Sequence, residues 1–177
     1  MAYVAITKTR NGFGISRLSF YIGRMSSYEF VSVWTIDAPL EAVWATIKDS
    51  EAWPEWWCGV VSVVELKPGD EKGNGAIHRS TWKSALPYKL EFDSEIIRIE
   101  EFKLIEARAF GELDGLGLWQ FSQMDSSVRV QYDWCVKTTK PWMNLIAPLA
   151  RPLFKWNHDV IMRWGEQGLK KRLAKSS

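Results

Sequence analysis

The chain has 177 residues, which is enough for one domain with a sizeable buried core, and its net charge of +2 conceals an uneven distribution. Residues 1–27 carry four basic side chains and no acid, residues 28–136 carry ten against nineteen acids, and residues 137–177 carry nine against two. The basic C-terminal part is therefore expected to dock on the acidic body. The Lys and Arg residues follow no RNA- or DNA-binding motif, which argues against a nucleic-acid partner.

Aromatic residues are unusually abundant, with eleven Trp, eight Phe and five Tyr. They supply more wide, flat apolar surface than a core of this size needs, so we expect some of them to line a cavity. The counts do not say which of these side chains point inward.

Cys58 and Cys135 stand far apart in the sequence and lack CxxC or Cys/His spacing. We interpret them as two buried thiols in a reducing, cytoplasmic compartment, with a single disulfide as the open alternative. The two His and two Cys form no metal-ligand pattern, and neither a Gly-rich phosphate loop nor a nucleophile elbow is present. The sequence therefore predicts no metal and no cofactor.

Residues 1–25 differ in composition from the rest of the chain. They are rich in Arg, Ser and Gly, lack acids, and contain no apolar run long enough for a signal peptide or a membrane span. Two interpretations stay open: a transit-like or disordered leader, or an upstream start codon with Met25 opening the folded domain. We favour the second, and expect residues 1–25 to be a leader outside one domain at residues 26–177.

The folded part is expected to begin with a strand and two short helices. "YEFVSVWTI" (28–36) is β-branched and aromatic, which is typical of a strand. "APLEAVWATIKD" (38–49) has Pro39 near its start and a helical apolar spacing formed by Leu40, Val43, Trp44 and Ile47. "SEAWPEWW" (50–57) is short and contains a proline, so it predicts one turn of helix and a bend.

Five or six strands then follow, because the apolar period changes to two. They are "GVVSVVELK" (59–67), "GAIHRSTWKS" (75–84), "YKLEFDSEIIRIE" (88–100), "KLIEARAFGEL" (103–113), "LGLWQFSQM" (116–124) and "SVRVQYDWCVKTT" (127–139). "PGDEKGNG" (68–75), "LDGLG" (113–117) and "MDSS" (124–127) are expected to connect them, which predicts an antiparallel meander. Alternation places one set of side chains of the last strand on a buried face: Val128, Val130, Tyr132, Trp134 and Val136.

The C-terminal segment predicts a long helix. Pro141, Pro148 and Pro152 favour a short helical turn, followed by a long helix from about Pro152 to about Lys171. Its apolar arc contains Leu153, Phe154, Trp156, Val160, Ile161 and Trp164. Asn157 lies near the middle of this arc, and His158 at its edge is expected to meet solvent. Gly165 and Gly168 are expected to allow close approach to the sheet or to leave room for something else.

This order of elements resembles the helix-grip fold of the SRPBCC (START/Bet v 1-like) superfamily over roughly residues 28–174. "IDAPLEAVWATIKDSEAWPEWW" is similar to its first strand and helix pair, and "LWQFSQMDSSVRVQYDWCV" is similar to its last hairpin. "KPWMNLIAPLARPLFKWNHDVIMRWGEQGLKKRLA" resembles the C-terminal helix of the polyketide cyclase/dehydrase-like branch. The resemblance implies an α+β fold, with a curved antiparallel sheet of six to seven strands wrapped around the long helix and a hydrophobic cavity between them.

The resemblance implies two classes of function, because members bind lipids, sterols, polyketides or plant metabolites and some cyclise polyketide chains, without a shared catalytic motif. The first hypothesis is a binder of a small hydrophobic ligand, a lipid, polyketide or aromatic metabolite. We expect its contacts to come from Asn157, Tyr132, Trp134, Trp119, Trp156, Phe154 and Ile161. The alternative roles are structural: Asn157 would satisfy a backbone group of the sheet, and Tyr132 would pack in the core.

The second hypothesis is a polyketide cyclase or dehydratase that folds a poly-carbonyl chain, with His78, Tyr132 or Arg108 moving a proton or stabilising an oxyanion. Alternation sends either His78 or Arg79 inward without indicating which, and Arg108 is equally explained by an exposed ion pair. A third hypothesis is that the basic, Trp-bearing segment 140–156 docks on an anionic membrane to load a lipid. Its prolines and the acidic body argue against that contact, and the sequence makes no prediction of oligomeric state.

Overall fold

The computed structural model describes residues 27–84, 88–139 and 141–175, with side chains at 28–84, 88–139 and 152–175. The expected leader at residues 1–25 and the proposed start at Met25 lie outside the described residues. In chain order the elements are β1 (Ser27–Ile36), α2 (Leu40–Lys48), α3 (Trp53–Trp56), β2 (Val60–Lys67), β3 (Ile77–Lys83), β4 (Lys89–Glu100), β5 (Leu104–Gly111), β6 (Leu113–Gln123), β7 (Val128–Thr138) and α4 (Pro141–Ala174).

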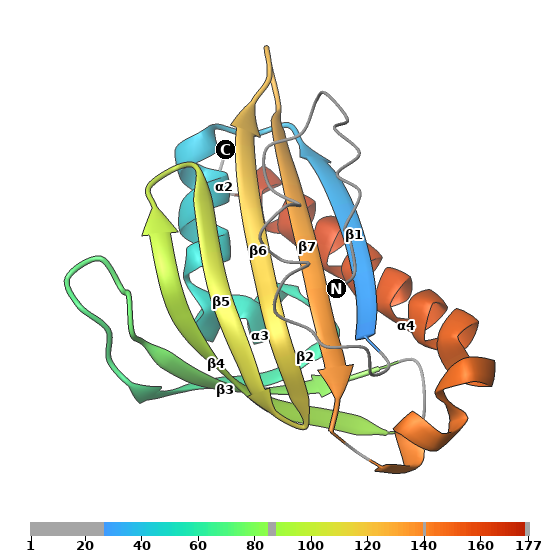
Figure 1. The fold of residues 1–177 in the computed structure, drawn as a ribbon. Helices are drawn as coiled ribbons and strands as arrows, with labels where there is room; N and C mark the ends of the chain where they lie inside the picture. Colours follow the sequence, from blue (N-terminus) through green and yellow to red (C-terminus); the bar gives the residue numbers. More distant parts are fainter. Residues whose placement is uncertain (1–26, 85–87, 140, 176–177) are drawn as a thin grey trace, which may run out of the picture.

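The strands form one seven-stranded sheet in the order β1-β7-β6-β5-β4-β3-β2, and every neighbouring pair is antiparallel. The first strand therefore pairs with the last, from Ser27 opposite Lys137 to Ile36 opposite Val128. β1 and β2 are consecutive strands in the sequence but lie at opposite edges of the sheet (Figure 1). The α2–α3 segment connects these edges.

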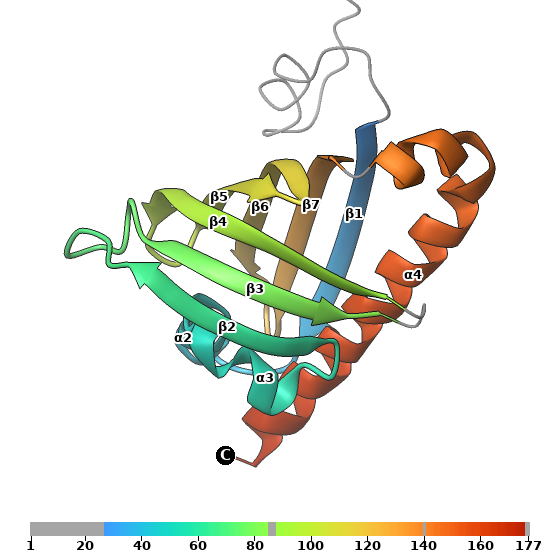
Figure 2. The ribbon, with the colours of Figure 1, turned by 90° about the horizontal axis from the view of Figure 1, so that it is seen from below.

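The sheet is curved, and α4 runs along its open side toward α3 (Figure 2). This is the helix-grip arrangement, so the predicted α+β fold, with a wrapped antiparallel sheet, two short helices after the first strand and a long C-terminal helix, is confirmed. The predicted spacing of α2 is also confirmed, because Val43, Trp44 and Ile47 are buried. A 3₁₀ turn at Ser50–Ala52 leads into α3, as the proline-broken sequence predicted.

The core lies on the concave face of the sheet. Val128, Val130 and Val136 of β7 are buried on the face that the alternation predicted. Val128 and Val130 pack in one cluster with the inward Trp34 and Ile36 of β1. Burial of these apolar side chains is the main favourable term for such a sheet, at about 25 cal/mol per Å² of apolar surface.

Two predicted boundaries were wrong. "LDGLG" is not a connection: β6 begins at Leu113 and continues through both glycines. A Cβ at Gly115 would lie 2.7 Å from Val136 Cα, and one at Gly117 would lie 2.6 Å from the Tyr132 hydroxyl oxygen, so these glycines allow β7 to come close. The helical turn expected before Pro152 is part of α4, which is continuous from Pro141. α4 changes direction in its N-terminal part, where the prolines remove backbone donors (Figures 1 and 2).

The glycines of α4 allow a close approach, but the partner is α3 and the residue after it rather than the sheet. A Cβ at Gly165 would lie 2.4 Å from Trp57 Cε2, and one at Gly168 would lie 1.8 Å from the carbonyl oxygen of Trp56. Both distances are far shorter than a van der Waals contact. α4 can therefore lie against Trp56 and Trp57 only because positions 165 and 168 carry no side chain.

The predictions about the charged C-terminal part and about the two cysteines are confirmed in part. Arg172 of α4 forms a 2.7 Å ion pair with Glu55 of α3, which agrees with the expected docking of the basic end on the acidic body. Both cysteines are free thiols and Cys135 is buried, but Cys58 is exposed, so the prediction of two buried thiols was wrong for Cys58. Cys58 follows the tight α3 segment, where burial of the tryptophans turns the next side chain outward.

Candidate ligand-binding site

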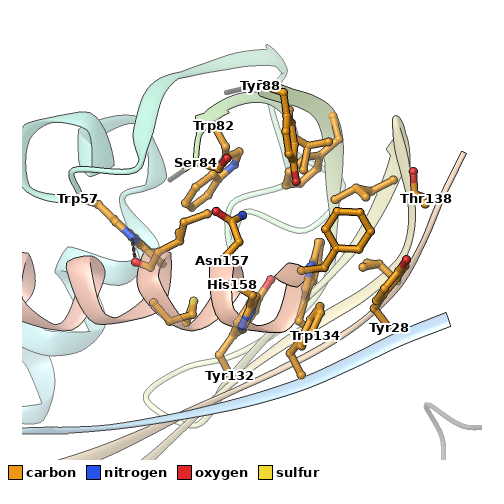
Figure 3. A pocket seen from close by; sticks show the side chains of 18 of the residues that line it. Tyr28, Trp57, Trp82, Ser84, Tyr88, Tyr132, Trp134, Thr138, Asn157 and His158 are labelled. Atoms are coloured by element: carbon orange, nitrogen blue, oxygen red, sulfur yellow. Dashed lines mark hydrogen bonds between the residues drawn. The ribbon is translucent and has the colours of Figure 1, made fainter. Parts of the chain in front are cut away.

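The concave side of the sheet and the middle of α4 enclose an apolar cavity of about 150 Å³, which we call the helix chamber (Figure 3). Most of its lining side chains are aromatic and come from β1, α3, β3, β4, β6, β7 and α4. Its lining residues are Tyr28, Phe30, Trp53, Trp57, Trp82, Ser84, Tyr88, Leu90, Phe92, Leu113, Trp119, Tyr132, Trp134, Val136, Thr138, Phe154, Asn157, His158, Ile161 and Met162.

One hydrogen bond fixes the wall of the helix chamber at α4. The Trp57 indole Nε1–H donates to the backbone carbonyl of Ile161 at 2.8 Å (Figure 3). Trp57 is also in ring contact with Trp34, Trp53, Trp82 and Trp119. A buried indole N–H needs an acceptor, and this one ties the segment after α3 to the helix at the level of the cavity.

Asn157 points from α4 into the helix chamber and is 7% exposed. Its position near the middle of the apolar arc was expected, and Figure 3 shows its amide among the aromatic side chains. An amide offers two N–H donors and a carbonyl acceptor, so it can orient a ligand that carries either partner.

His158 also lies in the wall of the helix chamber, which corrects the expectation of a solvent-edge side chain. The side chain is only 13% exposed, and its ring stacks on Phe30 with 4.3 Å between centroids. Burial lowers the pKa of His158 to about 4, although the neighbouring Asp159 carboxylate opposes this shift. The ring is therefore neutral at pH 7. His158 lies there because α4 is rotated so that the side of the helix carrying Phe154, His158 and Ile161 faces the cavity.

Tyr132 stands at the centre of an aromatic stack on the concave face. Its ring lies 4.1 Å from that of Trp119 and 5.7 Å from that of Trp134. Desolvation by burial raises the pKa of Tyr132, so the hydroxyl keeps its proton and acts as a neutral hydrogen-bonding group. The hydroxyl lies against Gly117.

A second cavity of about 440 Å³ lies on the other side of this stack, beneath the loop between β2 and β3; we call it the loop chamber. His78 lines it, so alternation sends His78 inward and Arg79 outward, where Arg79 pairs with Asp93 at 2.8 Å. His78 Nε2 lies 3.8 Å from Glu65 Oε2 across the β2–β3 pair. Ser80 and Ser94 add two hydroxyl groups to the same wall.

Most of the proposed ligand contacts come together in one place. Six of them line the helix chamber: Asn157, Tyr132, Trp134, Trp119, Phe154 and Ile161. Trp156 does not, because its side chain is 48% exposed and lines neither chamber. Residues two apart on a helix point about 200° apart, so the inward direction of Phe154 turns Trp156 outward.

The proposed catalytic residues are not brought together. Tyr132 lines both chambers and His78 lines only the loop chamber. Arg108 is exposed and lies on the convex face of β5, opposite to the inward Ala107 and Ala109, so it meets neither cavity. Side chains alternate between the two faces of a strand. Ile105 of β5 is buried, so Arg108, three residues later, points to the opposite face.

Several lining residues were missed from the sequence. Tyr28 and Phe30 share the inward face of β1 with Trp34 and could have been found by alternation. Trp53 and Trp57 lie in and after the short α3, where no apolar period indicates direction. The position of Trp57 depends on the long-range contact with Gly165 of α4.

In the part of the chain that the structure describes, His, Cys, Asp and Glu side chains form no group of three that could hold a metal ion. Among the same residues, no helix combines the length and the hydropathy needed to cross a bilayer.

Comparison with solved structures shows the same fold. The chain resembles TTHA0849 from Thermus thermophilus (23% identity, 85% of this chain and 100% of that one, TM-score 0.68) and a START superfamily protein from Mycobacterium smegmatis (14%, 84% and 99%, 0.69). It also resembles the ZhuI aromatase/cyclase from Streptomyces sp. R1128 (13%, 84% and 94%, 0.67). It spans 50% of the di-domain ARO/CYC BexL. At these identities the likeness concerns the fold.

Comparison with curated proteins gave no match. The family model described as "Polyketide cyclase / dehydrase and lipid transport" matches residues 28–174, which includes every strand and helix from β1 to α4 almost completely. By this match the chain belongs to the polyketide cyclase/dehydrase and lipid transport family, and it shares the helix-grip fold of the START superfamily protein compared above.

Proposed function

We propose that this protein binds a small, flat and mainly apolar molecule, such as a polyketide, an aromatic metabolite or a lipid, in the helix chamber. One observation carries the proposal: none of the described residues that line this chamber has a formally charged side chain at pH 7, and more than half of them are aromatic. Aromatic walls offer flat surfaces that stack on a planar ligand. Apolar burial, at about 25 cal/mol per Å², would supply most of the affinity.

Polar groups of the chamber then set the orientation of the ligand. Asn157 offers donors and an acceptor, and Tyr132 offers a hydroxyl that stays protonated. A ligand with a carbonyl or hydroxyl group can exchange hydrogen bonds with these groups, whereas a pure hydrocarbon cannot. This favours an oxygenated ligand over an alkane.

Native mass spectrometry of protein purified without refolding tests the proposal, followed by extraction of any retained molecule. The emptied protein is then titrated with dansylamide, a flat aromatic probe. We expect a retained or titrated ligand at one site, with affinity at least tenfold lower in Ile161→Phe, which fills the helix chamber, and unchanged in Trp156→Ala. A protein that retains nothing and does not bind dansylamide up to the solubility limit of the probe would contradict the proposal.

The second candidate function is cyclisation or dehydration of a poly-carbonyl chain. It is supported by Tyr132, which borders both chambers, and by His78 with Glu65 in the loop chamber. The cavity would hold an enolisable carbon near a carbonyl, His78 would remove the proton, and the Tyr132 hydroxyl would donate to the developing oxyanion. Arg108 has no part in this scheme because it lies on the convex face.

The two functions are separated by turnover of a linear tetraketide thioester. For the enzyme we expect His78→Ala to lower kcat at least a hundredfold while the affinity for the substrate changes little. Arg79→Ala, which alters the neighbouring outward side chain, is the matched control. Wild-type protein that binds the thioester without converting it would favour the carrier function.

A reducing, cytoplasmic location is part of the proposal, since Cys58 and Cys135 are free thiols. Loading from an anionic membrane through segment 140–156 remains a separate prediction. It requires the protein to sediment with anionic vesicles at low salt, and failure to do so would exclude it.

A further inference from the structure

The interior of the protein is divided in two by one aromatic wall. The helix chamber and the loop chamber share a set of lining residues, which we call the aromatic partition: Trp53, Trp82, Phe92, Trp119, Tyr132 and Trp134. These side chains present surfaces to both cavities. The two cavities are therefore the two sides of the same rings, not unrelated pockets.

The partition is held by ring contacts. Trp119, Tyr132 and Trp134 form a continuous stack, and Trp53 lies 6.1 Å from Trp82 between ring centroids. The stack depends on Gly117, because a Cβ there would lie 2.6 Å from the Tyr132 hydroxyl oxygen and 2.9 Å from the Trp134 ring. β6 and β7 thus build one side of the partition, and α3 and β3 supply the other.

Within the partition, Trp53 and Trp82 differ in how their indole N–H groups are held. Trp82 Nε1 is buried and has no hydrogen-bond partner among the described residues, whereas Trp53 Nε1 donates to the backbone carbonyl of Ile47. A buried N–H without an acceptor is destabilising. Rotation of the Trp82 side chain breaks no hydrogen bond within the described part of the chain, and an oxygen atom of a ligand would supply the missing acceptor.

The two chambers differ in chemistry. Side chains with formal charge are absent from the described lining of the helix chamber. The loop chamber presents His78, Ser80 and Ser94 from the concave faces of β3 and β4, and His78 stands directly opposite Ser94 in the register. Charged side chains also line this chamber, including Lys48, Glu65 and Lys72.

From this asymmetry we infer that the two chambers form one binding site for an elongated amphipathic molecule. The flat apolar part lies in the helix chamber, and an oxygen-bearing end passes Trp82 to reach His78, Ser80 and Ser94 in the loop chamber. The inference rests on the proposed binding function and adds to it the length, the polarity and the direction of the ligand.

Two fluorescent probes test this arrangement in the full chain: dansylamide, which is the flat ring alone, and 11-(dansylamino)undecanoic acid, which adds a long chain with a carboxylate end. Ser94→Phe fills the loop chamber and Ile161→Phe fills the helix chamber. Glu95→Phe places the same side chain on the convex face of β4 as the matched control. Melting curves establish that each variant is folded, and Ser94→Leu replaces Ser94→Phe if the larger side chain unfolds the protein.

We expect wild-type protein to bind the undecanoic probe at least tenfold more tightly than dansylamide. Ser94→Phe should lower the affinity for the undecanoic probe at least tenfold and change that for dansylamide less than twofold. Ile161→Phe should weaken both probes at least tenfold, and Glu95→Phe neither. Trp82→Phe, which removes the indole N–H, should weaken binding of the undecanoic probe about threefold to tenfold more than binding of dansylamide.

Two results would overturn the inference. An affinity for the undecanoic probe that Ser94→Phe leaves unchanged would mean that the chain does not enter the loop chamber. Equal weakening of both probes by Ser94→Phe would mean that the flat ring, not the polar end, lies there. A wild-type protein that binds neither probe would instead contradict the proposed function itself, so the two failures are distinguishable.

Discussion

The part of α4 with described side chains, residues 152–174, has two halves that meet the rest of the protein in opposite ways. The cavity half, residues 154–162, presents Phe154, Asn157 and Ile161 to open interior space. In the packed half, residues 165–173, Gly165 lies against Trp57 and Gly168 against Trp56, with no room for a methyl group. One continuous helix therefore carries both a tight anchor and a cavity wall.

This difference has an energetic meaning. Protein interiors are close-packed, and unfilled apolar space lowers stability because the lining atoms lose van der Waals partners. The packed half of α4, with Leu169 and Leu173 buried, fixes the helix firmly enough for the cavity half to leave space unfilled. A ligand in that space would then add stability through binding.

The largest effect is expected in the packed half. Gly168→Ala should lower the free energy of unfolding by about 2 kcal/mol or more, because the added Cβ would lie 1.8 Å from the backbone carbonyl oxygen of Trp56. Overpacking typically costs about 1–3 kcal/mol, and the better helix propensity of Ala returns at most about 1 kcal/mol. Urea denaturation measures the change. Gln167→Ala, at the exposed neighbouring position, should stay within about 0.5 kcal/mol of wild type, and an equal loss in both variants would contradict the tight contact.

Acid should weaken the cavity half through His158. The pKa is about 4 in the folded protein against 6.5 for an unperturbed His, so the unfolded chain binds more protons in the window between these values. The free energy of unfolding should fall as the pH drops from 6.5 to 4, by about 3 kcal/mol for this shift. Lys155 and Asp159 are the charged groups that act on His158, and they remain in the variant His158→Phe. Denaturation at a series of pH values should show this loss in wild type but not in the variant; parallel curves would exclude a buried neutral histidine.

A smaller change is expected from Asn157→Leu, which replaces the polar group of the cavity wall with an apolar one of similar size. Binding of dansylamide should weaken about tenfold, equivalent to about 1.4 kcal/mol, while the free energy of unfolding changes by less than about 1 kcal/mol. Titration and thermal melting with and without probe give both quantities. A melting temperature that falls equally in both conditions would mean that Asn157 joins helix to sheet and does not orient a ligand.

The smallest effect is expected at Trp156, which lies on α4 within the cavity half but points away from the cavity. Trp156→Ala should change the free energy of unfolding by no more than about 0.5 kcal/mol and dansylamide affinity by less than twofold. If this variant weakened binding as Asn157→Leu does, the orientation of α4 described above would be wrong.

Sequence patterns predicted the strands well because a two-residue period needs little long-range information. The buried face of β7 followed from alternation alone, and the spacing of Val43, Trp44 and Ile47 predicted α2. Alternation could not choose between His78 and Arg79, since the choice depends on which side of β3 faces α4.

The orientation of α4 was harder to predict, and this limited the candidate site. Hydropathy placed Trp156 in the apolar arc and His158 at its edge, whereas the structure exposes the first and buries the second. The helix is turned by the contact of Gly165 and Gly168 with α3, and glycines add nothing to a hydrophobic pattern. That contact joins segments about 110 residues apart, which no local pattern reports.

The pairing of β1 with β7 has a consequence for synthesis. Ser27 pairs with Lys137, so about 110 further residues must be synthesised after Ser27 before its partner is available. At translation rates of about 5–20 residues per second, this interval is roughly 5–20 s. Non-local pairing of this kind slows folding, and α4 emerges later still. The helix chamber therefore closes only after α4 has left the ribosome, and until then the interior of the sheet is open to any small molecule present.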